Sequence, residues 1–249
     1  MESTYSAPHT QCVPSSYRMV TREENGLGRI YADDPIFSQG KDFAKSLVLE
    51  PNCSKNFCRL AQGCRGLPVV ILMNPCDRHT GDFGDMLINN SAILWLKNFF
   101  SEFGLDFEYD VPILDMFTLL SDHWLRHNVH RGQAETQELI RRSCDITQEL
   151  LEFLQPSTIV VMHCATNTSS GRRHPFFGSV QHPLVESLSS SMEKAEERTM
   201  QTLNVCGRAT PVIPAFHPSR INYEDDFKEK KRLTLLLRDI LSSVFLPYV

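Results

Sequence analysis

Several polar side chains that could take part in catalysis follow short apolar runs of the sequence. Asn74 ends the run "LPVVILMN", and His217 follows the run "TPVIPAF" in a His-Pro-Ser turn. Asp115 lies inside a third run, "VPILDMF". An amide can orient a water molecule, a neutral imidazole can donate a hydrogen bond to developing negative charge, and a carboxylate can only accept hydrogen bonds. Polar residues at strand ends also cap helices and close turns, so a purely structural role is the alternative for each.

The elements that must position these side chains can be read from the apolar pattern. Four short runs are typical of strands buried on both faces, at residues 67–74, 111–117, 157–164 and 210–217. Helical patterns cover residues 88–103, 140–154, 184–203 and 233–244. This alternation predicts an α/β fold with a mostly parallel sheet that is covered on both faces. In such a sheet ligands bind beyond the carboxyl ends of the strands, where the polar exits are expected to meet.

Composition and charge limit the classes of protein that this chain can belong to. The 249 residues are 41% hydrophobic and 22% charged, which is typical of a globular domain. Residues 1–35 are polar and without periodicity, so we expect a flexible N-terminal tail and one domain over residues 36–249. The net charge of -5 means that a nucleic acid would have to be met by a local basic patch.

The sequence also bears on compartment and partners. It contains no run of about 20 apolar residues and no signal-peptide pattern, so we expect a soluble, intracellular monomer without a membrane partner. Several of the eight cysteines lie in apolar segments, as expected for reduced core thiols.

Two of the strand exits resemble a known family. The segment "VVILMNPCDRHTGDFG" and, about 140 residues later, "VIPAFHPSRI" are similar to the Asn-Pro and His-Pro-Ser turns of the uracil-DNA glycosylase superfamily. The resemblance implies a three-layer sandwich with a central four-stranded, mostly parallel sheet. It also implies a monofunctional glycosylase that removes uracil or a related deaminated pyrimidine from DNA in base-excision repair, in the nucleus rather than the cytoplasm and without cofactor or metal.

The same resemblance implies a role for each motif residue. Asn74 would hold the attacking water, and His217 would donate to the pyrimidine O2 as the base leaves. Phe83 would stack on the flipped base. The residues that would contact DNA are Pro75, Pro218, Ser219, Arg220 and Ile221. Of these, Ser219 and Arg220 would bind phosphates and Ile221 would enter the duplex as an apolar wedge.

Three positions depart from the family pattern. Phe83 lies closer to the Asn-Pro turn than in the family, and Cys76 stands where a glycine is common. Asp115 replaces the asparagine that reads uracil. A carboxylate would be repelled by the O4 atom of uracil, which is also an acceptor. It could instead accept a hydrogen bond from an exocyclic amine, as acidic side chains do with cytosine N4. A different base, a carboxyl kept protonated by burial and a site that no longer cuts all remain open, as does a simple capping role in "MFTLLSDHW".

Two further functions therefore stand beside the glycosylase. One is a catalytically weak or inactive protein of the same fold that binds nucleic acid or a nucleotide, and the other is an N-glycosidase of small nucleosides.

Two other motifs give weaker evidence for function. The histidines His123, His127 and His130 could share a helix face, but no acidic or cysteine partner follows at metal-site spacing. The loop "SSGRRHPFFG" is either a basic phosphate contact or an ordinary surface loop.

Overall fold

The computed structural model of the chain describes residues 28–128, 133–162, 180–188 and 190–249. Its centre is a five-stranded sheet in the order β4-β3-β5-β7-β6. Four neighbouring strands are parallel and coincide with the four apolar runs, so the α/β prediction is confirmed. They are β3 (Val69–Leu72), β4 (Ile113–Asp115), β5 (Ile159–Val161) and β7 (Arg208–Pro214).

The fifth strand corrects the predicted four-stranded sheet. β6 (Gln201–Val205) pairs antiparallel with β7, at residues that we had included in a helix over 184–203. Cys206 and Gly207, both at positive φ, form the two-residue connection between the strands, as in a type I′ hairpin. The charged segment before them forms only the short helices α8 (Pro183–Ser187) and α9 (Met192–Glu197). The tight turn therefore allows an edge strand to form in a segment whose composition had predicted a helix.

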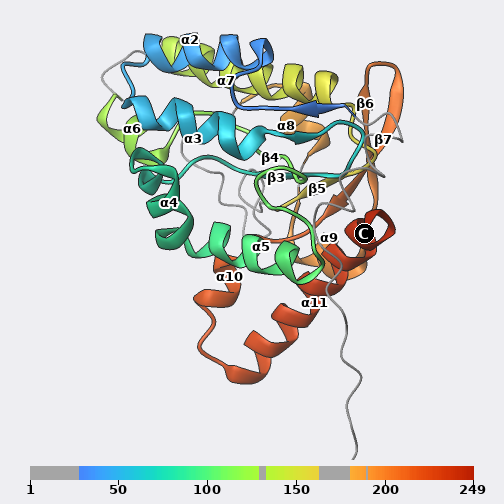
Figure 1. Cartoon of the computed structure of the whole chain (residues 1–249). Helices are drawn as coiled ribbons and strands as arrows, with labels where there is room; N and C mark the ends of the chain where they lie inside the picture. The colour runs from blue at the N-terminus through green and yellow to red at the C-terminus, as the bar shows by residue number, and fades with distance from the viewer. Residues whose placement is uncertain (1–27, 129–132, 163–179, 189) are drawn as a thin grey trace, which may run out of the picture.

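Helices cover both faces of the sheet (Figure 1), and the strands bury alternate side chains on each. Val69 and Ile71 belong to the core shared with α2 (Ser38–Ser46) and α7 (Gln133–Leu154). Val70 and Leu72 belong to the core shared with the other helical group. That group consists of α4 (Phe83–Asn89), α5 (Ser91–Glu102) and α11 (Phe227–Phe245). Alternation over continuously apolar strands is expected when neither face meets water.

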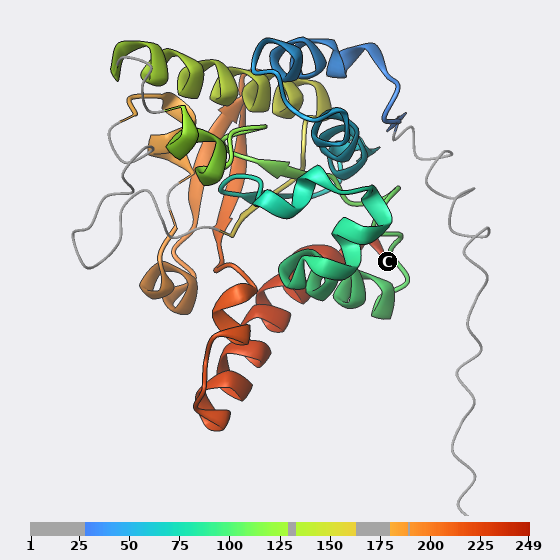
Figure 2. The same ribbon diagram turned by 90° about the vertical axis from the view of Figure 1, so that its left-hand side faces the viewer.

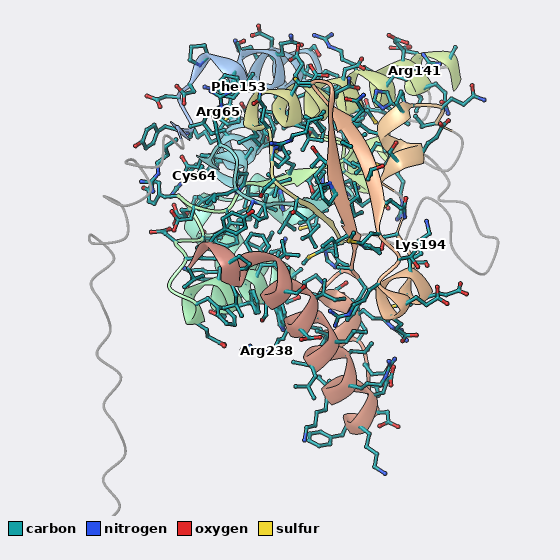
Figure 3. All side chains as sticks on the ribbon, turned by 90° about the vertical axis from the view of Figure 1, so that its right-hand side faces the viewer. Cys64, Arg65, Arg141, Phe153, Lys194 and Arg238 are labelled. Atoms are coloured by element: carbon teal, nitrogen blue, oxygen red, sulfur yellow. The ribbon has the colours of Figure 1, made fainter. Side chains whose placement is uncertain are left out.

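The periodic patterns place the longest helices correctly. In α7, the predicted stripe Ile140, Cys144, Thr147, Leu151 and Leu154 is fully buried. In α11, Asp226 caps the first turn by accepting hydrogen bonds from two backbone amides, and the leucine and isoleucine stripe behind it is buried. Side-chain pairs also tie elements together: the Arg65 guanidinium lies over the Phe153 ring and donates to that residue's carbonyl, fixing the end of α7 (Figure 3).

The packed structure begins earlier than residue 36. β1 (Arg29–Ile30) pairs with β2 (Gly63–Cys64), Ile30 is 2% exposed, and Arg29 forms an ion pair with Asp110 at 3.2 Å. Residues 28–35, which the sequence predicted to be part of the tail, thus belong to the packed structure. Residues 1–27 lie outside the described structure.

The remaining elements are short, except for α3. They are η1 (Pro35–Phe37), α3 (Pro51–Ala61), η2 (Asp77–Thr80), α6 (Asp122–His127), α10 (Ser219–Asn222) and η3 (Leu246–Tyr248). In Figure 1, the helices that follow β3, β4 and β7 along the chain, namely α4, α6 and α10, lie on the same side of the molecule, which faces the reader in Figure 2. Within the described ranges, we find no helix that combines the length and apolar character needed to cross a membrane.

Candidate active site

A cavity of about 360 Å³ opens beside the carboxyl end of β4. Its wall is formed by the start of α3 and the turn before it, the turn after β3 with η2, the end of β4, and α6. Phe57 and Trp124 supply aromatic rings, Pro75 comes from the predicted Asn-Pro turn, and Asp115 is the polar residue contributed by the sheet. Among the described residues that line this cavity there is neither lysine nor arginine. The site therefore combines a carboxyl group with aromatic and apolar walls.

Asp115 has an unusual environment for a carboxyl group. It ends β4, where it is the partner of Leu72, and its Oδ1 is buried without a hydrogen-bond partner within the described structure. Burial raises the pKa of the carboxyl to about 7. The capping alternative does not hold, because Ser121 caps α6 and accepts from the Trp124 amide. Asp115 therefore faces the cavity as an acid that is partly neutral near physiological pH.

Two buried hydroxyls fix the main chain of Asp115. Its carbonyl accepts from Thr147 Oγ1 at 2.8 Å and from Thr118 Oγ1 at 3.0 Å. The two threonines are also 2.9 Å apart, and Ser143 donates to the Thr118 carbonyl at 2.6 Å. Thr147 and Ser143 come from α7, so the helix on one face of the sheet holds the end of β4 in place. From the sequence, Thr147 was only one position in a helical stripe.

Asn74 is held in one orientation by two acceptors. Its Nδ2 donates to the Leu120 carbonyl at 3.3 Å and to Asp122 Oδ1 at 3.1 Å. Since both partners can only accept here, the nitrogen must face them and the side-chain oxygen must face the opposite way. An oxygen fixed like this can accept a hydrogen bond from a water molecule or a ligand.

His217 is set up as a neutral hydrogen-bond donor. Its Nδ1 accepts from the Ser219 backbone amide at 3.3 Å and lies 2.6 Å from Ser219 Oγ, whose hydroxyl donates to it. This arrangement places the ring proton on Nε2. Burial lowers the pKa of His217 to about 4, so the ring is uncharged at neutral pH. Ser219, predicted to bind a phosphate, instead orients the imidazole in this structure.

The sheet register relates these side chains to one another. Ile71 is aligned with Val161 and Val161 with Pro214, and Asn74 and His217 each lie three residues beyond this line. Because β5 separates the two strands, their exits are two strand spacings apart, about 10 Å. The strand order reverses direction between β3 and β5, which is where ligands bind in open parallel sheets. The exit of β5, residues 163–167, lies outside the described residues.

The cavity does not include all of the predicted site. Asp115 and Pro75 line it, but Asn74 and His217 do not. Phe83 is 5% exposed at the start of α4, and the Arg59 guanidinium lies 3.8 Å from its ring centroid. It is therefore not placed to stack on a base in the cavity. The sequence missed the aromatic residues that line the cavity, Phe57 and Trp124, because they lie on flanking helices without a motif.

The predicted DNA contacts divide into buried and exposed residues. Ile221 is 4% exposed in the core with α5 and α11, so it is not the exposed wedge that the resemblance implies. Pro75 and Pro218 are buried and stiffen their turns. Arg220 forms an ion pair with Glu224 at 3.5 Å, and its side chain is 55% exposed, so solvent still reaches it. Of these residues, Arg220 offers the accessible positive charge.

Among the described residues there is no group of three or more histidine, cysteine, aspartate or glutamate side chains arranged to hold a metal ion. His123 and His127 stack with ring centroids 4.0 Å apart. His130 and the loop "SSGRRHPFFG" lie outside the described residues.

Cys76 lines the cavity at the position where the family pattern has glycine. Its sulfur accepts a hydrogen bond from the side-chain amide of Asn90.

No model of a known protein family matches the chain, and no curated protein matches it either.

Proposed function

We propose that the chain is a monofunctional DNA-base glycosylase that hydrolyses the N-glycosidic bond of uracil or a related pyrimidine. The observation that carries the proposal is the state of His217, a neutral imidazole whose Nδ1 is occupied and whose Nε2–H can donate to a ligand. The proposal includes a three-layer fold of the uracil-DNA glycosylase type, supported by the parallel strands and the helices on both faces. DNA with a flipped nucleotide is the proposed partner.

The chemistry follows from how charge develops. As the bond from the sugar C1′ to the base nitrogen breaks, its electron pair moves onto the base and positive charge builds on the sugar. The His217 Nε2–H would stabilise the anionic base oxygen, since a preorganised donor is most effective where charge develops. The Asn74 oxygen would orient the water whose oxygen bonds to C1′, and the water's proton is released to the base or to solvent. Asp115 would read the edge of the base.

A second candidate function is binding of a nucleobase or nucleotide without cleavage. It is favoured by one observation, that Asn74 and His217 do not line the cavity that contains Asp115. The absence of lysine and arginine from the described lining also weakens the case for a phosphate backbone at this point.

The test is excision by purified protein. Single- and double-stranded oligonucleotides with uracil, other deaminated bases or cytosine are incubated and then treated with alkali, which breaks the strand at abasic sites. Activity should fall about 10²–10³-fold in His217→Ala, the usual effect of removing one charge-stabilising donor. Asn74→Ala should also lose activity, whereas His127→Ala, at an exposed histidine of α6, is the matched control.

The outcomes separate the two functions. Strand breaks that depend on His217 support the glycosylase. Unbroken strands for every base in the panel contradict it, and tight binding to uracil-containing or abasic DNA that is unchanged in His217→Ala would then favour the non-cleaving function.

A further inference from the structure

The cavity beside β4 is lined by Asp115, and Oδ1 of this carboxyl group is buried without a hydrogen-bond partner among the described residues. We infer that this cavity binds a flat ring that presents two adjacent N–H groups, an amidine-type edge as in an amino-substituted or cationic base, with Asp115 as the acceptor. The inference deepens the proposed function, because it names the edge of the base that the site selects. Binding at the cavity can nevertheless be measured without any cleavage.

The hydrogen-bonding groups favour such a ligand. An ionised carboxylate has only acceptors, and its two oxygens match two parallel N–H donors. Asp115 Oδ1 lies in the protein without a donor from the described residues, and an unsatisfied buried acceptor is unfavourable. A ligand N–H pair that draws the carboxyl group toward the cavity would supply the missing donor. The uracil edge offers an acceptor, O4, beside N3–H, and so suits an amide or a protonated carboxyl better than a carboxylate.

The walls also favour a flat ring with partial or full positive charge. Phe57 and Trp124 line the cavity, and aromatic rings attract cations as well as other rings. The Trp124 indole N–H donates to the Leu47 carbonyl at 3.3 Å, which fixes how the ring is turned. A volume of about 360 Å³ is at the small end of ligand pockets, so it suits one small ring system.

The other described titratable groups that line the cavity are an acid, two thiols and two histidines, with neither lysine nor arginine among them. Glu50 precedes α3 and adds a second acid, while Cys53 lies within α3, where burial raises the pKa of its thiol. From the turn after β3 come Cys76 and His79, and burial lowers the pKa of His79 to about 4. His123 of α6 is an exposed residue that also lines the cavity.

Binding should therefore be coupled to a proton. The N–H pair favours the ionised carboxylate, and burial holds the pKa of the free site at about 7. Below that pH the ligand must displace a proton, so affinity should rise about tenfold from pH 6 to pH 8.

The experiment compares two rings of the same shape by calorimetric titration of the full-length chain. Benzamidine carries a cationic N–H pair, and benzamide carries an oxygen in place of one nitrogen and is neutral. At pH 8 benzamidine should bind at least tenfold more tightly than benzamide. Asp115→Asn should abolish this preference, since an amide side chain has no negative charge and only one acceptor. Asn has nearly the same shape, and thermal unfolding checks that the variant is folded.

A control separates Asp115 from the second acid of the cavity. Glu50→Gln should keep the preference for benzamidine and its pH dependence. Equal binding of the two probes, or a preference that persists in Asp115→Asn and disappears in Glu50→Gln, overturns the inference. The two proposals fail separately. A preference that depends on Asp115 supports the inference even if no oligonucleotide is cut, and its absence overturns the inference even if uracil is excised.

Discussion

The three polar residues at the carboxyl edge of the sheet differ in how fully their neighbours satisfy them. Asn74 and His217 are each fixed by two hydrogen bonds, so only one polar atom of each is directed elsewhere. Asp115 is fixed through its main chain while its Oδ1 has no partner within the described structure. A protein gains nothing in stability from such a carboxyl group. Perturbed groups of this kind are concentrated at functional sites, which is why the inferred ligand preference is built on Asp115.

At the residue scale, Asp115 should make stability depend on pH. Its pKa is raised in the folded state, so between about pH 4 and pH 7 the folded protein keeps a proton that the unfolded chain releases. The free energy of unfolding should therefore fall as pH rises through this window, by about 4 kcal/mol in total, and level off above pH 7. Asp115→Asn lacks this proton and should gain stability relative to the natural protein by the same amount.

Urea unfolding of the two proteins from pH 4 to pH 8 measures this difference. His79 and His217 also have shifted pKa values, but both proteins contain them, so their contributions cancel. Asp225→Asn, at an exposed carboxylate before α11, is the control and should stay within about 0.5 kcal/mol. A difference between the natural protein and the Asp115→Asn variant that is constant with pH would contradict the prediction.

At the scale of elements, the site depends on contacts between the sheet and helices far away in the chain. α7 lies on one face of the sheet and uses Thr147 to hold the carbonyls of Asp115 and Met116, at 2.8 and 3.2 Å. The hydroxyl is buried, so its hydrogen bonds are not replaced by water when it is removed. The helix thus positions the strand end as well as covering the core.

Thr147→Val should therefore destabilise the protein by about 1–3 kcal/mol, because the shape is kept while buried carbonyl groups lose one of their donors. Chemical unfolding measures the change. The matched control is Thr234→Val on α11, where the hydroxyl donates to Lys230 at the surface and a change within about 0.5 kcal/mol is expected. Equal effects of the two variants would show that the bond to Asp115 adds nothing.

At the scale of the whole molecule, the sheet packs between two helical groups, and the N-terminal strand joins this packed structure. β1 closes against β2, and Ile30 enters the core that α2 and α7 share. A chain that starts at residue 36 should accordingly be less stable than one that starts at residue 28, by about 2–5 kcal/mol, the usual effect of removing a buried isoleucine.

The two truncated chains differ only in residues 28–35, so thermal or urea unfolding compares them directly. The shorter chain loses the pairing of β1, Ile30 and the ion pair of Arg29 with Asp110. Identical unfolding curves would contradict this prediction and show that residues 28–35 add no stability, as expected for the predicted tail.

The sequence by itself determined the parallel strands, the long helices and the edge of the sheet at which Asn74, Asp115 and His217 lie. These features follow from burial within each element, and burial leaves a periodic apolar pattern that can be read locally. The same local pattern identified the His-Pro-Ser turn at the end of β7.

Only the tertiary structure decided which side chains meet. It buried Ile221 and Phe83, placed Phe57 and Trp124 around the cavity, and joined Thr147 to the carbonyl of Asp115. It also added β6, which a two-residue turn pairs with β7. Contacts between residues far apart in the chain depend on how elements pack in three dimensions, and a residue's type and spacing carry no record of the partner that packing brings to it.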